Sequence, residues 1–372
     1  MQIFTLSVAF AMTFLVDILA FVPPTCQPPS ARGLVPFSRP ASSCKSAATP
    51  SADDEVFGAG RPHEINMTEG EDDLYVVGAG YLGKLVAGLW LEKFPSATVV
   101  CETRSVVRHV GGMPEGSTFL LRRHRLDYQR KYRNVVFTAS PKGNQDYEHE
   151  VFQAAAHLWD GQGMLVMTST GSIYSENQGG TVTEYSPVDT KKVTSRIIEG
   201  AENFAVGAGG CVIRLAGLYS VDRGPHNVWL TMKKVMQHPQ GLINLLSYED
   251  AADIVVSALI AGRPEPNPLE NPTAGQKIKG HIFLACDDHP TTRHDICEVA
   301  LAHPFHGWKK MPQFEMTGHC RDESGAKRLY DSSSTREALG WQPKWASFEE
   351  YFDRQIAEAR GKMMEEEGVT AV

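Results

Sequence analysis

A glycine-rich turn between an apolar strand and an amphipathic helix is the feature that most constrains the fold. Residues 74–77 are apolar, and Gly78, Gly80 and Gly83 follow them in the pattern Gly-x-Gly-x-x-Gly. Apolar residues then recur at helical spacing over 85–90, which predicts a helix with one buried face. Strand, glycine turn and helix in this order predict a βαβ unit and therefore a parallel sheet.

The glycines of this turn stand at the three positions that a dinucleotide-binding turn requires. The first glycine makes the tight bend, the second lets the backbone approach a pyrophosphate, and the third lets helix and strand pack closely. The N–H groups at the start of the helix then face the phosphates. The expected phosphate-binding residues are Gly78, Ala79, Gly80, Tyr81, Leu82 and Gly83. The alternative is a turn of this kind that no longer binds a cofactor.

The second strand is expected at 97–101 and is followed by Glu102, nineteen residues after Gly83. An acidic residue there accepts hydrogen bonds from the ribose hydroxyls of NAD, whereas a neighbouring arginine pairs with the 2′-phosphate of NADP. Arg104 lies two residues after Glu102. The sequence therefore predicts NAD or NADP as the cofactor, and it leaves the choice between them open.

Strands and helices alternate along the rest of the chain. Further apolar runs predict strands at 135–139, 164–168, 212–215 and 281–285. Helical patterns separate them at 147–158 and 193–204. This alternation predicts an α/β fold with a doubly wound parallel sheet of the Rossmann type. The expected parts are an NAD(P)-binding domain at 71–215, the remaining sheet strands with a smaller C-terminal substrate lobe at 216–360, and a tail at 361–372.

The first 70 residues have the composition of targeting segments rather than of a folded domain. Residues 1–20 are almost wholly apolar, as in a signal peptide, and residues 21–70 begin with a stretch that has no acid before Asp53, as in a transit peptide and linker. The junction at 19–23, Leu-Ala-Phe-Val-Pro, resembles the cleavage point of plastid presequences in algae with secondary plastids. That resemblance implies a mature protein in the chloroplast stroma. A secreted protein and a single N-terminal anchor are the alternatives.

Charge and cysteine content exclude several classes of protein. The net charge of −8 gives no electrostatic reason to expect a nucleic acid partner. The one basic cluster, at 122–133, is expected to be a solvated helix face, with RNA binding as the alternative. Because the seven cysteines form no CxxC pair, we expect Cys101, Cys211 and Cys286 to be reduced core residues.

Four histidines fall in one segment, at His289, His294, His303 and His306. They lack cysteine or carboxylate partners at the spacing of a metal site. We therefore expect surface or capping histidines and no metal.

Several stretches beyond the glycine turn resemble, in order and spacing, the landmarks of extended short-chain dehydrogenases. They are Phe137–Pro141, Met167–Tyr174, Thr183–Pro187, Ile213–Tyr219, Ile243–Ala252, Lys327–Leu329 and Leu339–Pro343. The match spans 72–360 and is closest to the NAD-dependent epimerases and dehydratases of nucleoside-diphosphate sugars and their atypical relatives. This resemblance implies that Ala139, Ser140 and Pro141 line the cofactor. It also implies a substrate that is a nucleotide sugar or another small hydroxylated or phosphorylated metabolite.

The sequence departs from that family at the acid/base pair. In the family a tyrosine is followed four residues later by a lysine, whose ammonium lowers the pKa of the phenol. No tyrosine of this sequence has a lysine at that spacing, and the best-matching positions hold Lys192 and Arg196. A guanidinium stays protonated, and Lys192 would need a strongly lowered pKa to act as a base. Thr170 matches the Ser/Thr that orients the substrate oxygen, with a strand-end cap as the alternative.

Two arginines bracket the stretch that meets the substrate in the family. Arg214 and Arg223 lie on either side of Tyr219, and arginine suits bidentate recognition of a phosphate. The alternatives are a buried ion pair for Arg214 and a solvated loop charge for Arg223.

The sequence thus predicts hydride transfer on a sugar-like hydroxyl, with a non-catalytic NAD(P)-binding sensor or scaffold in the plastid as the alternative. We expect a small-molecule substrate, no nucleic acid and no membrane contact of the mature chain, and a homodimer is an open alternative to a monomer.

Overall fold

The computed structural model describes residues 70–104, 112–127, 130–263, 276–315 and 328–366. The expected targeting segments therefore lie outside the described residues, apart from Gly70. Residues from Thr68 onward form one compact unit. Within the described ranges, no helix combines the length and the apolar character that crossing a membrane would require.

Seven parallel strands form the central sheet. They are β1 (Leu74–Val77), β2 (Val99–Thr103), β3 (Ser117–Leu121), β4 (Tyr132–Phe137), β5 (Trp159–Thr170), β7 (Cys211–Leu215) and β12 (Ile282–Ala285). Their spatial order is β3-β2-β1-β4-β5-β7-β12, so the chain winds outward from β1 to β3 and then returns to the other side of β1. The order reverses between β1 and β4, which confirms the doubly wound Rossmann-type sheet.

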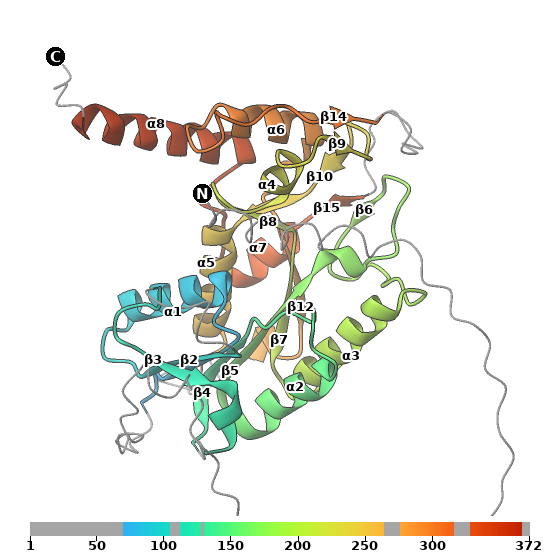
Figure 1. Cartoon of the computed structure of the whole chain (residues 1–372). Coiled ribbons are helices and arrows are strands. Elements are labelled where there is room, and N and C mark those ends of the chain that lie inside the picture. Colours follow the sequence, from blue (N-terminus) through green and yellow to red (C-terminus); the bar gives the residue numbers. More distant parts are fainter. Residues whose placement is uncertain (1–69, 105–111, 128–129, 264–275, 316–327, 367–372) are drawn as a thin grey trace, which may run out of the picture. The chain divides into compact units, whose positions relative to one another are not determined.

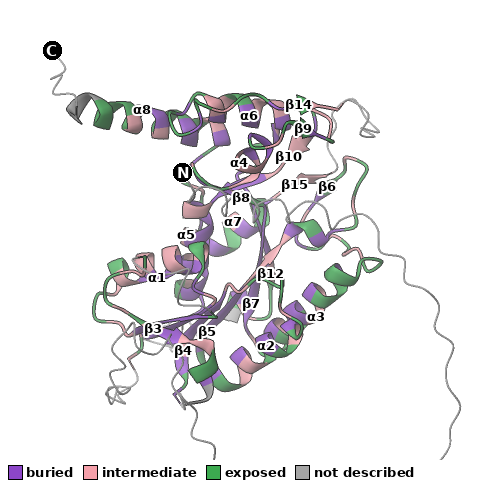
Figure 2. Cartoon of the chain, in the orientation of Figure 1, coloured by how far each residue is buried: buried purple, intermediate pink, exposed green. Residues whose placement is uncertain are grey.

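Helices cover both faces of the sheet, as Figure 1 shows. On one face lie α1 (Tyr81–Lys93) and α5 (Tyr248–Ala261), and on the other lie α2 (Tyr147–Gln153) with its π-helical extension (Ala154–Leu158) and α3 (Val193–Gly207). Because both faces are covered, the central strands contain continuous apolar runs rather than an alternating pattern. In Figure 2 these central strands are mostly purple, the colour of buried residues, whereas the edge strand β3 has mostly intermediate and exposed residues.

A smaller lobe lies above the carboxyl ends of the strands in Figure 1. Its helices are α4 (Pro225–Trp229), α6 (Arg293–Leu301) and α8 (Phe348–Glu366), and its short ladders pair β8 (Gly217–Tyr219) with β11 (Leu245–Ser247), β9 (Lys234–Val235) with β14 (Gln313–Phe314) and β10 (Leu242–Ile243) with β13 (Thr291–Thr292). Trp229, Ile296 and Phe352 are part of its buried core. The helix α7 (Ser333–Leu339) and the ladder of β6 (Thr181–Val182) with β15 (Leu329–Tyr330) complete the described α-helices and strands.

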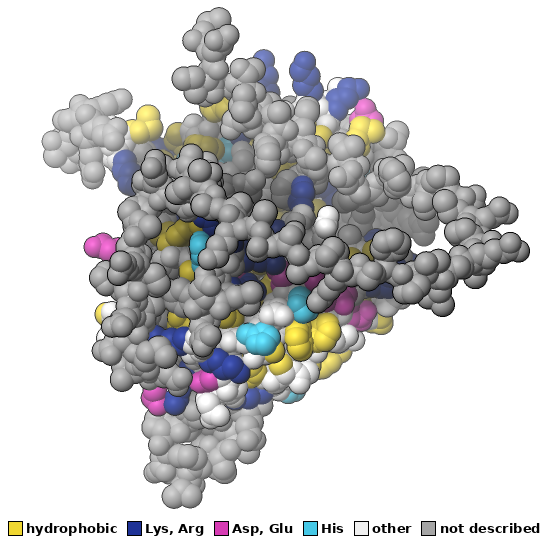
Figure 3. Space-filling view, turned by 60° about the horizontal axis from the view of Figure 1, so that its bottom comes forward, with side chains coloured by type: hydrophobic (Ala, Val, Ile, Leu, Met, Phe, Trp, Pro, Cys, Tyr) yellow, Lys and Arg dark blue, Asp and Glu magenta, His cyan; other side chains and the backbone are white. Residues whose placement is uncertain are grey.

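The basic cluster is not the solvated helix face that the sequence predicts. It begins with a 3₁₀ turn at Arg122–Asp127, and its arginines reach acidic side chains elsewhere in the domain: Arg122 pairs with Glu150, Arg125 with Glu102, Arg130 with Asp73 and Arg133 with Glu71. Figure 3 shows basic and acidic side chains next to one another on the visible face. Since these cations are neutralised from within, the cluster gives no support to RNA binding.

Two of the four histidines are buried rather than at the surface. His303 and His306 are 7% and 0% exposed, and the His306 Nε2 atom lies 2.7 Å from the Val221 carbonyl. Burial lowers the pKa of both rings. The prediction of surface or capping histidines is therefore wrong for this pair, because the rings fill the lobe core against Phe352 and the neighbouring His226.

Candidate functional site

Two glycines of the turn are required by contacts inside the protein. Gly78 has φ +90°, and a Cβ there would lie 2.6 Å from the Ala139 backbone. A Cβ on Gly83 would lie 2.7 Å from the Gly78 carbonyl oxygen and 2.8 Å from Thr138 Oγ1. The first glycine therefore makes the bend, and the last lets α1 pack closely onto the sheet.

Gly80 has no such internal reason to be glycine. Its φ is −74°, and the nearest atom to a Cβ there would be the Gly78 carbonyl oxygen, 3.9 Å away. It is the N-cap of α1, which has neither a side-chain cap nor an acidic residue in its first turn. The backbone over Gly80 is thus open, and it presents uncapped N–H groups with the positive end of the helix dipole. A dinucleotide pyrophosphate fits this cradle.

The carboxyl ends of β1, β2 and β4 meet at this turn. The N–H groups of Gly78 and Ala79 donate to the Glu102 carbonyl at 3.0 and 2.8 Å, and the Thr138 N–H donates to the Val77 carbonyl at 2.8 Å. The loop that holds Ala139, Ser140 and Pro141 follows directly. The structure therefore brings together the three stretches that were predicted separately for the cofactor.

The Glu102 carboxylate is engaged within the protein. It is 2% exposed, and Arg125 binds it through two hydrogen bonds, Nε to Oε2 at 2.6 Å and Nη2 to Oε1 at 2.5 Å. The Tyr75 hydroxyl also donates to Oε2 at 2.7 Å. A carboxylate with a bidentate guanidinium partner is neutralised and turned away from a ribose.

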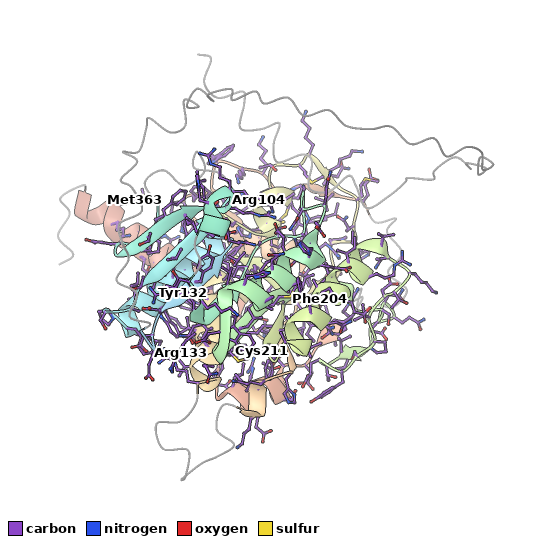
Figure 4. The ribbon with its side chains drawn as sticks, turned by 90° about the horizontal axis from the view of Figure 1, so that it is seen from below. Arg104, Tyr132, Arg133, Phe204, Cys211 and Met363 are labelled. Carbon is purple, nitrogen blue, oxygen red and sulfur yellow. The ribbon has the colours of Figure 1, made fainter. Side chains whose placement is uncertain are left out.

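Arg104, in contrast, is exposed at the end of β2. Its guanidinium donates to the carbonyl oxygens of Gly143 at 3.1 Å and Ser140 at 3.4 Å, so it bridges the β2 end to the loop after β4. Figure 4 shows Arg104 on the other side of the molecule from Arg133 and Cys211, which lie near the amino ends of β4 and β7. A cation thus stands at the carboxyl edge of the sheet, where ligands bind.

Arg223 lies at the glycine turn. Its guanidinium carbon is 4.5 Å from the centroid of the Tyr81 ring, and this ring meets Tyr248 edge-on at 4.7 Å. Arg223 is half exposed, and its Nε atom is 3.7 Å from Asp222. The lobe therefore places a second accessible cation beside the first residue of α1.

The residues predicted for proton transfer are exposed. Lys192 is the N-cap of α3, and its side chain is 56% exposed with Nζ 2.9 Å from Asp189. Arg196 is exposed on the first turn of the same helix.

Thr170 ends β5, and its hydroxyl donates to Ser172 Oγ at 3.0 Å and accepts the Ser172 N–H at 3.2 Å. This strand-end cap is the alternative that the sequence left open for Thr170, and it leaves the hydroxyl at the carboxyl edge of the sheet.

Arg214 and Tyr219 are buried, at 3% and 0% exposure. Arg214 Nη2 lies 2.7 Å from Glu202 Oε2, which is the buried ion pair that the sequence left as the alternative. Tyr219 belongs to the lobe core, with its ring 4.8 Å from Phe348, and burial is the main cause that raises the pKa of its phenol. Of the three residues predicted for the substrate, only Arg223 is accessible.

Sequence reasoning missed two polar residues at the carboxyl edge, Arg328 and Tyr330. Arg328 Nη1 donates to the carbonyl oxygens of Tyr174 at 2.6 Å and Gly171 at 3.4 Å. Tyr330 stands against Gly171. Their separation from Thr170 in sequence hides this contact, and the one signal was a glycine directly after Thr170.

His294 is one of three neighbouring groups that could together hold a metal ion, and Asp295 and Glu298 are the others. All three lie on α6, away from the glycine turn in sequence, and their side chains are 40%, 47% and 69% exposed. Exposed acidic groups of this kind are ordinary features of a helix surface.

Comparison with known proteins gives the fold a context. No family model and no curated protein matches the sequence. Solved structures do match. A functionally unknown conserved protein from Silicibacter pomeroyi is 18% identical, with a TM-score of 0.57 over 77% of this chain and 99% of that one. The dTDP-glucose 4,6-dehydratase of Bacillus anthracis, solved with NAD, is 15% identical, with a TM-score of 0.57 over 79% and 97%.

The UDP-glucose 4-epimerase of Thermotoga maritima, solved with UDP-glucose, is 14% identical, with a TM-score of 0.57 over 78% of this chain and 99% of that one. This chain has the fold of NAD-dependent epimerases and dehydratases. At such identities the likeness shows the fold alone, and chemistry has to be argued from the site.

Proposed function

We propose that this protein is an NADP(H)-binding, atypical short-chain dehydrogenase that acts on a nucleotide sugar or another small hydroxylated or phosphorylated metabolite. The open backbone over Gly80 carries the proposal. Gly78 and Gly83 are needed by internal packing, whereas position 80 has no internal contact that requires a glycine, and a ligand that approaches the backbone would account for one there. Tyr81 and Leu82, the first two residues of α1, would hold the pyrophosphate with their N–H groups, whereas the Gly80 N–H donates to the Gly78 carbonyl.

The charges at the β2 end support a preference for NADP(H) over NAD(H). Glu102 is neutralised by Arg125, so it offers no free carboxylate to ribose hydroxyls and no repulsion to a 2′-phosphate. Arg104 is exposed at the same end of the strand. A guanidinium pairs with a phosphate through charge-assisted hydrogen bonds. Ser140, on the neighbouring loop, supplies a further hydroxyl at this edge.

Thermal unfolding in the presence of NAD, NADH, NADP and NADPH in turn tests the proposal, because a ligand that binds only the folded state raises the midpoint. We expect a rise with NADPH and NADP and a smaller one with NADH and NAD. The Arg104→Ala variant should lose about 10- to 100-fold in NADPH affinity, since a hydrogen bond to a charged group contributes about 1.5–3 kcal/mol. Its NADH affinity should change little.

Arg354→Ala is the matched control, because Arg354 is an exposed arginine of α8 that pairs with Glu358 on the same helix. It should respond to NADPH like the unaltered protein. No midpoint shift with any of the four dinucleotides would overturn the proposal. A shift with NADPH but no turnover of any nucleotide sugar would favour the non-catalytic sensor or scaffold, which the missing Tyr-Lys pair also favours.

The substrate class follows from the neighbours' ligands and from Arg223. One neighbour was solved with UDP-glucose, and Arg223 offers a half-exposed guanidinium at the turn. We propose that Arg223 pairs with a phosphate of the ligand, whereas Arg214 and Tyr219 support the fold from inside. Turnover of UDP- and dTDP-sugars with NADP or NADPH, followed by absorbance of the reduced nicotinamide, tests this assignment.

We also propose delivery to the chloroplast stroma through residues 1–70. The apolar start, the Leu-Ala-Phe-Val-Pro junction and the acid-poor stretch that follows support it. A fluorescent protein fused behind residues 1–70 should accumulate in plastids of an alga with secondary plastids. The same fusion with Phe21→Ala should stop outside the stroma, and secretion of both fusions would contradict the proposal.

A further inference from the structure

Tyr330 lies against the residue that follows Thr170. A Cβ built on Gly171 would lie 2.6 Å from the phenol oxygen of Tyr330 and 2.7 Å from its Cε2 and Cζ atoms. The phenol therefore occupies the space that a side chain at position 171 would need. Since Thr170 ends β5, the Tyr330 hydroxyl lies at the carboxyl edge of the sheet, where ligands bind in this class of fold.

The fold holds the ring and leaves its hydroxyl available. Tyr330 belongs to β15, which pairs with β6, and its N–H donates to Asn244 Oδ1 at 2.9 Å. The ring packs edge-on against Tyr174 at 6.1 Å. Among the described residues the Tyr330 hydroxyl has no hydrogen-bond partner, and Tyr330 is only partly buried. The oxygen can therefore accept or donate a hydrogen bond to a ligand.

Arg328 supplies a positive charge next to this phenol. Its hydrogen bonds to the Tyr174 and Gly171 carbonyls fix the guanidinium at the same edge. Burial raises the pKa of Tyr330 to about 12, and the Arg328 charge opposes that rise. A phenol beside a fixed cation is the arrangement that tunes a tyrosine for proton transfer.

We propose that Tyr330 is the proton-transfer residue of this site and that Arg328 is its positioning residue, in place of the missing Tyr-Lys pair on α3. The proposal rests on the proposed function, in which a reduced nicotinamide, when bound, would supply the hydride that reduces a carbonyl carbon and would itself be oxidised. Tyr330 Oη donates its proton to the carbonyl oxygen, so that the C=O group becomes an alcohol with one new C–H and one new O–H bond. Water then returns a proton to the phenolate. In the reverse direction the phenolate accepts the proton of the substrate hydroxyl.

The position and protonation of Tyr330 favour it over Lys192. The Lys192 side chain is 56% exposed and paired with Asp189. A phenol with a raised pKa is protonated at neutral pH, which suits a proton donor in the reducing direction.

The test follows the phenol directly and needs no substrate. The protein is produced with 3-fluorotyrosine, and the ¹⁹F resonance of Tyr330 is assigned by its loss in Tyr330→Phe. Each resonance is then titrated with pH while NADP or NADPH is bound. Because the oxidised ring carries a positive charge, we expect NADP to lower the pKa of this phenol by about one pH unit relative to NADPH. The resonance of Tyr185, whose side chain is 82% exposed, is the control and should titrate alike with both.

Each outcome separates the two proposals. Binding of both cofactors with the same Tyr330 titration would overturn the role of Tyr330 and leave the proposed function standing. If neither NADP nor NADPH binds, both the proposed function and the role of Tyr330 are overturned. Arg328→Met should raise the pKa of Tyr330, whereas Arg328→Lys should leave it unchanged. The same Tyr330 pKa in the two variants would show that Arg328 is only structural. Tyr330→Phe keeps the ring packing, so its unfolding midpoint without cofactor should match that of the unaltered protein.

Discussion

Two glycines of helix α1 differ in the space that is available for a side chain. A Cβ on Gly83 would meet the Gly78 carbonyl and Thr138 Oγ1 below 3 Å, whereas a Cβ on Gly88 would meet nothing within 4 Å. We predict that Gly83→Ala lowers stability and abolishes the NADPH-induced rise in the unfolding midpoint, because the turn must shift. We predict that Gly88→Ala stabilises the protein by about 0.5–1 kcal/mol, since glycine weakens a helix interior by that amount.

Thermal unfolding of both variants, with and without NADPH, checks this pair. The cofactor response of Gly88→Ala should equal that of the unaltered protein. A Gly83→Ala variant that still responds to NADPH would contradict the close packing of helix and strand at this position.

Asp287 makes the stability of the protein depend on pH. It is 5% exposed, its Oδ2 atom has no partner among the described residues, and burial raises its pKa to about 8. In the unfolded chain an aspartate has a pKa of about 3.9. Between these values the folded state binds more protons than the unfolded state, so this group's contribution is present at low pH and is lost as the pH rises towards 8.

We predict that Asp287→Asn increases stability at pH 8 more than at pH 5, by up to about 1.4 kcal/mol per pH unit. The asparagine oxygen can still accept the His289 N–H, which lies 3.0 Å from Asp287 Oδ1. Urea unfolding at the two pH values measures the difference. Asp353→Asn, at an exposed position of α8, is the control, and an equal effect of both variants would contradict the raised pKa of Asp287.

At the scale of elements, one buried ion pair ties α3 to β7. Glu202 is 0% exposed, and its carboxylate receives Arg214 at 2.7 and 3.1 Å and the Ser169 hydroxyl at 2.5 Å. We predict that Arg214→Met lowers the free energy of unfolding by about 3–5 kcal/mol, because it leaves a buried carboxylate without its cation. The double variant with Glu202→Leu should recover part of this loss. Urea unfolding compares the single and the double variant. An equal free energy of unfolding for both would contradict a charged Glu202 that is paired with Arg214.

Element by element, the sequence predicted the buried strands and missed the partly exposed ones. β1, β4, β5, β7 and β12 lie where apolar runs indicated them, because strands covered on both faces must be continuously apolar. β3 was missed since it is an edge strand with exposed and intermediate residues, which breaks the run. The short ladders of the lobe, of two or three residues each, are too brief to create a period.

At the scale of the whole molecule, we expect the domain to fold without the first 69 residues. Among the described residues, both core clusters of the sheet begin at β1 and include residues from Leu74 onward. We predict that a protein of residues 70–372 unfolds at the same midpoint as the full chain and responds equally to NADPH. Thermal unfolding of the two proteins checks this, and a midpoint several degrees lower in the shorter one would show that the leading segment stabilises the domain.

The sequence by itself determined the class of fold and the position of the glycine turn. Both are local: the glycine spacing, the apolar run at 74–77 and the helical period that follows lie within about twenty residues, and period and turn chemistry act over such distances. The absence of the Tyr-Lys pair was equally visible, because a fixed spacing on one helix can be searched directly.

Only the tertiary structure decided what the charged and polar side chains do. Glu102 has a suitable place for NAD, but Arg125, 23 residues away, neutralises it, and Tyr330 reaches Gly171 from the far end of the chain. Such contacts depend on which strand ends the sheet brings together, and no local pattern encodes them. The sequence could therefore place the glycine turn, whereas the proposed cofactor preference and the proposed proton donor rest on contacts between distant segments.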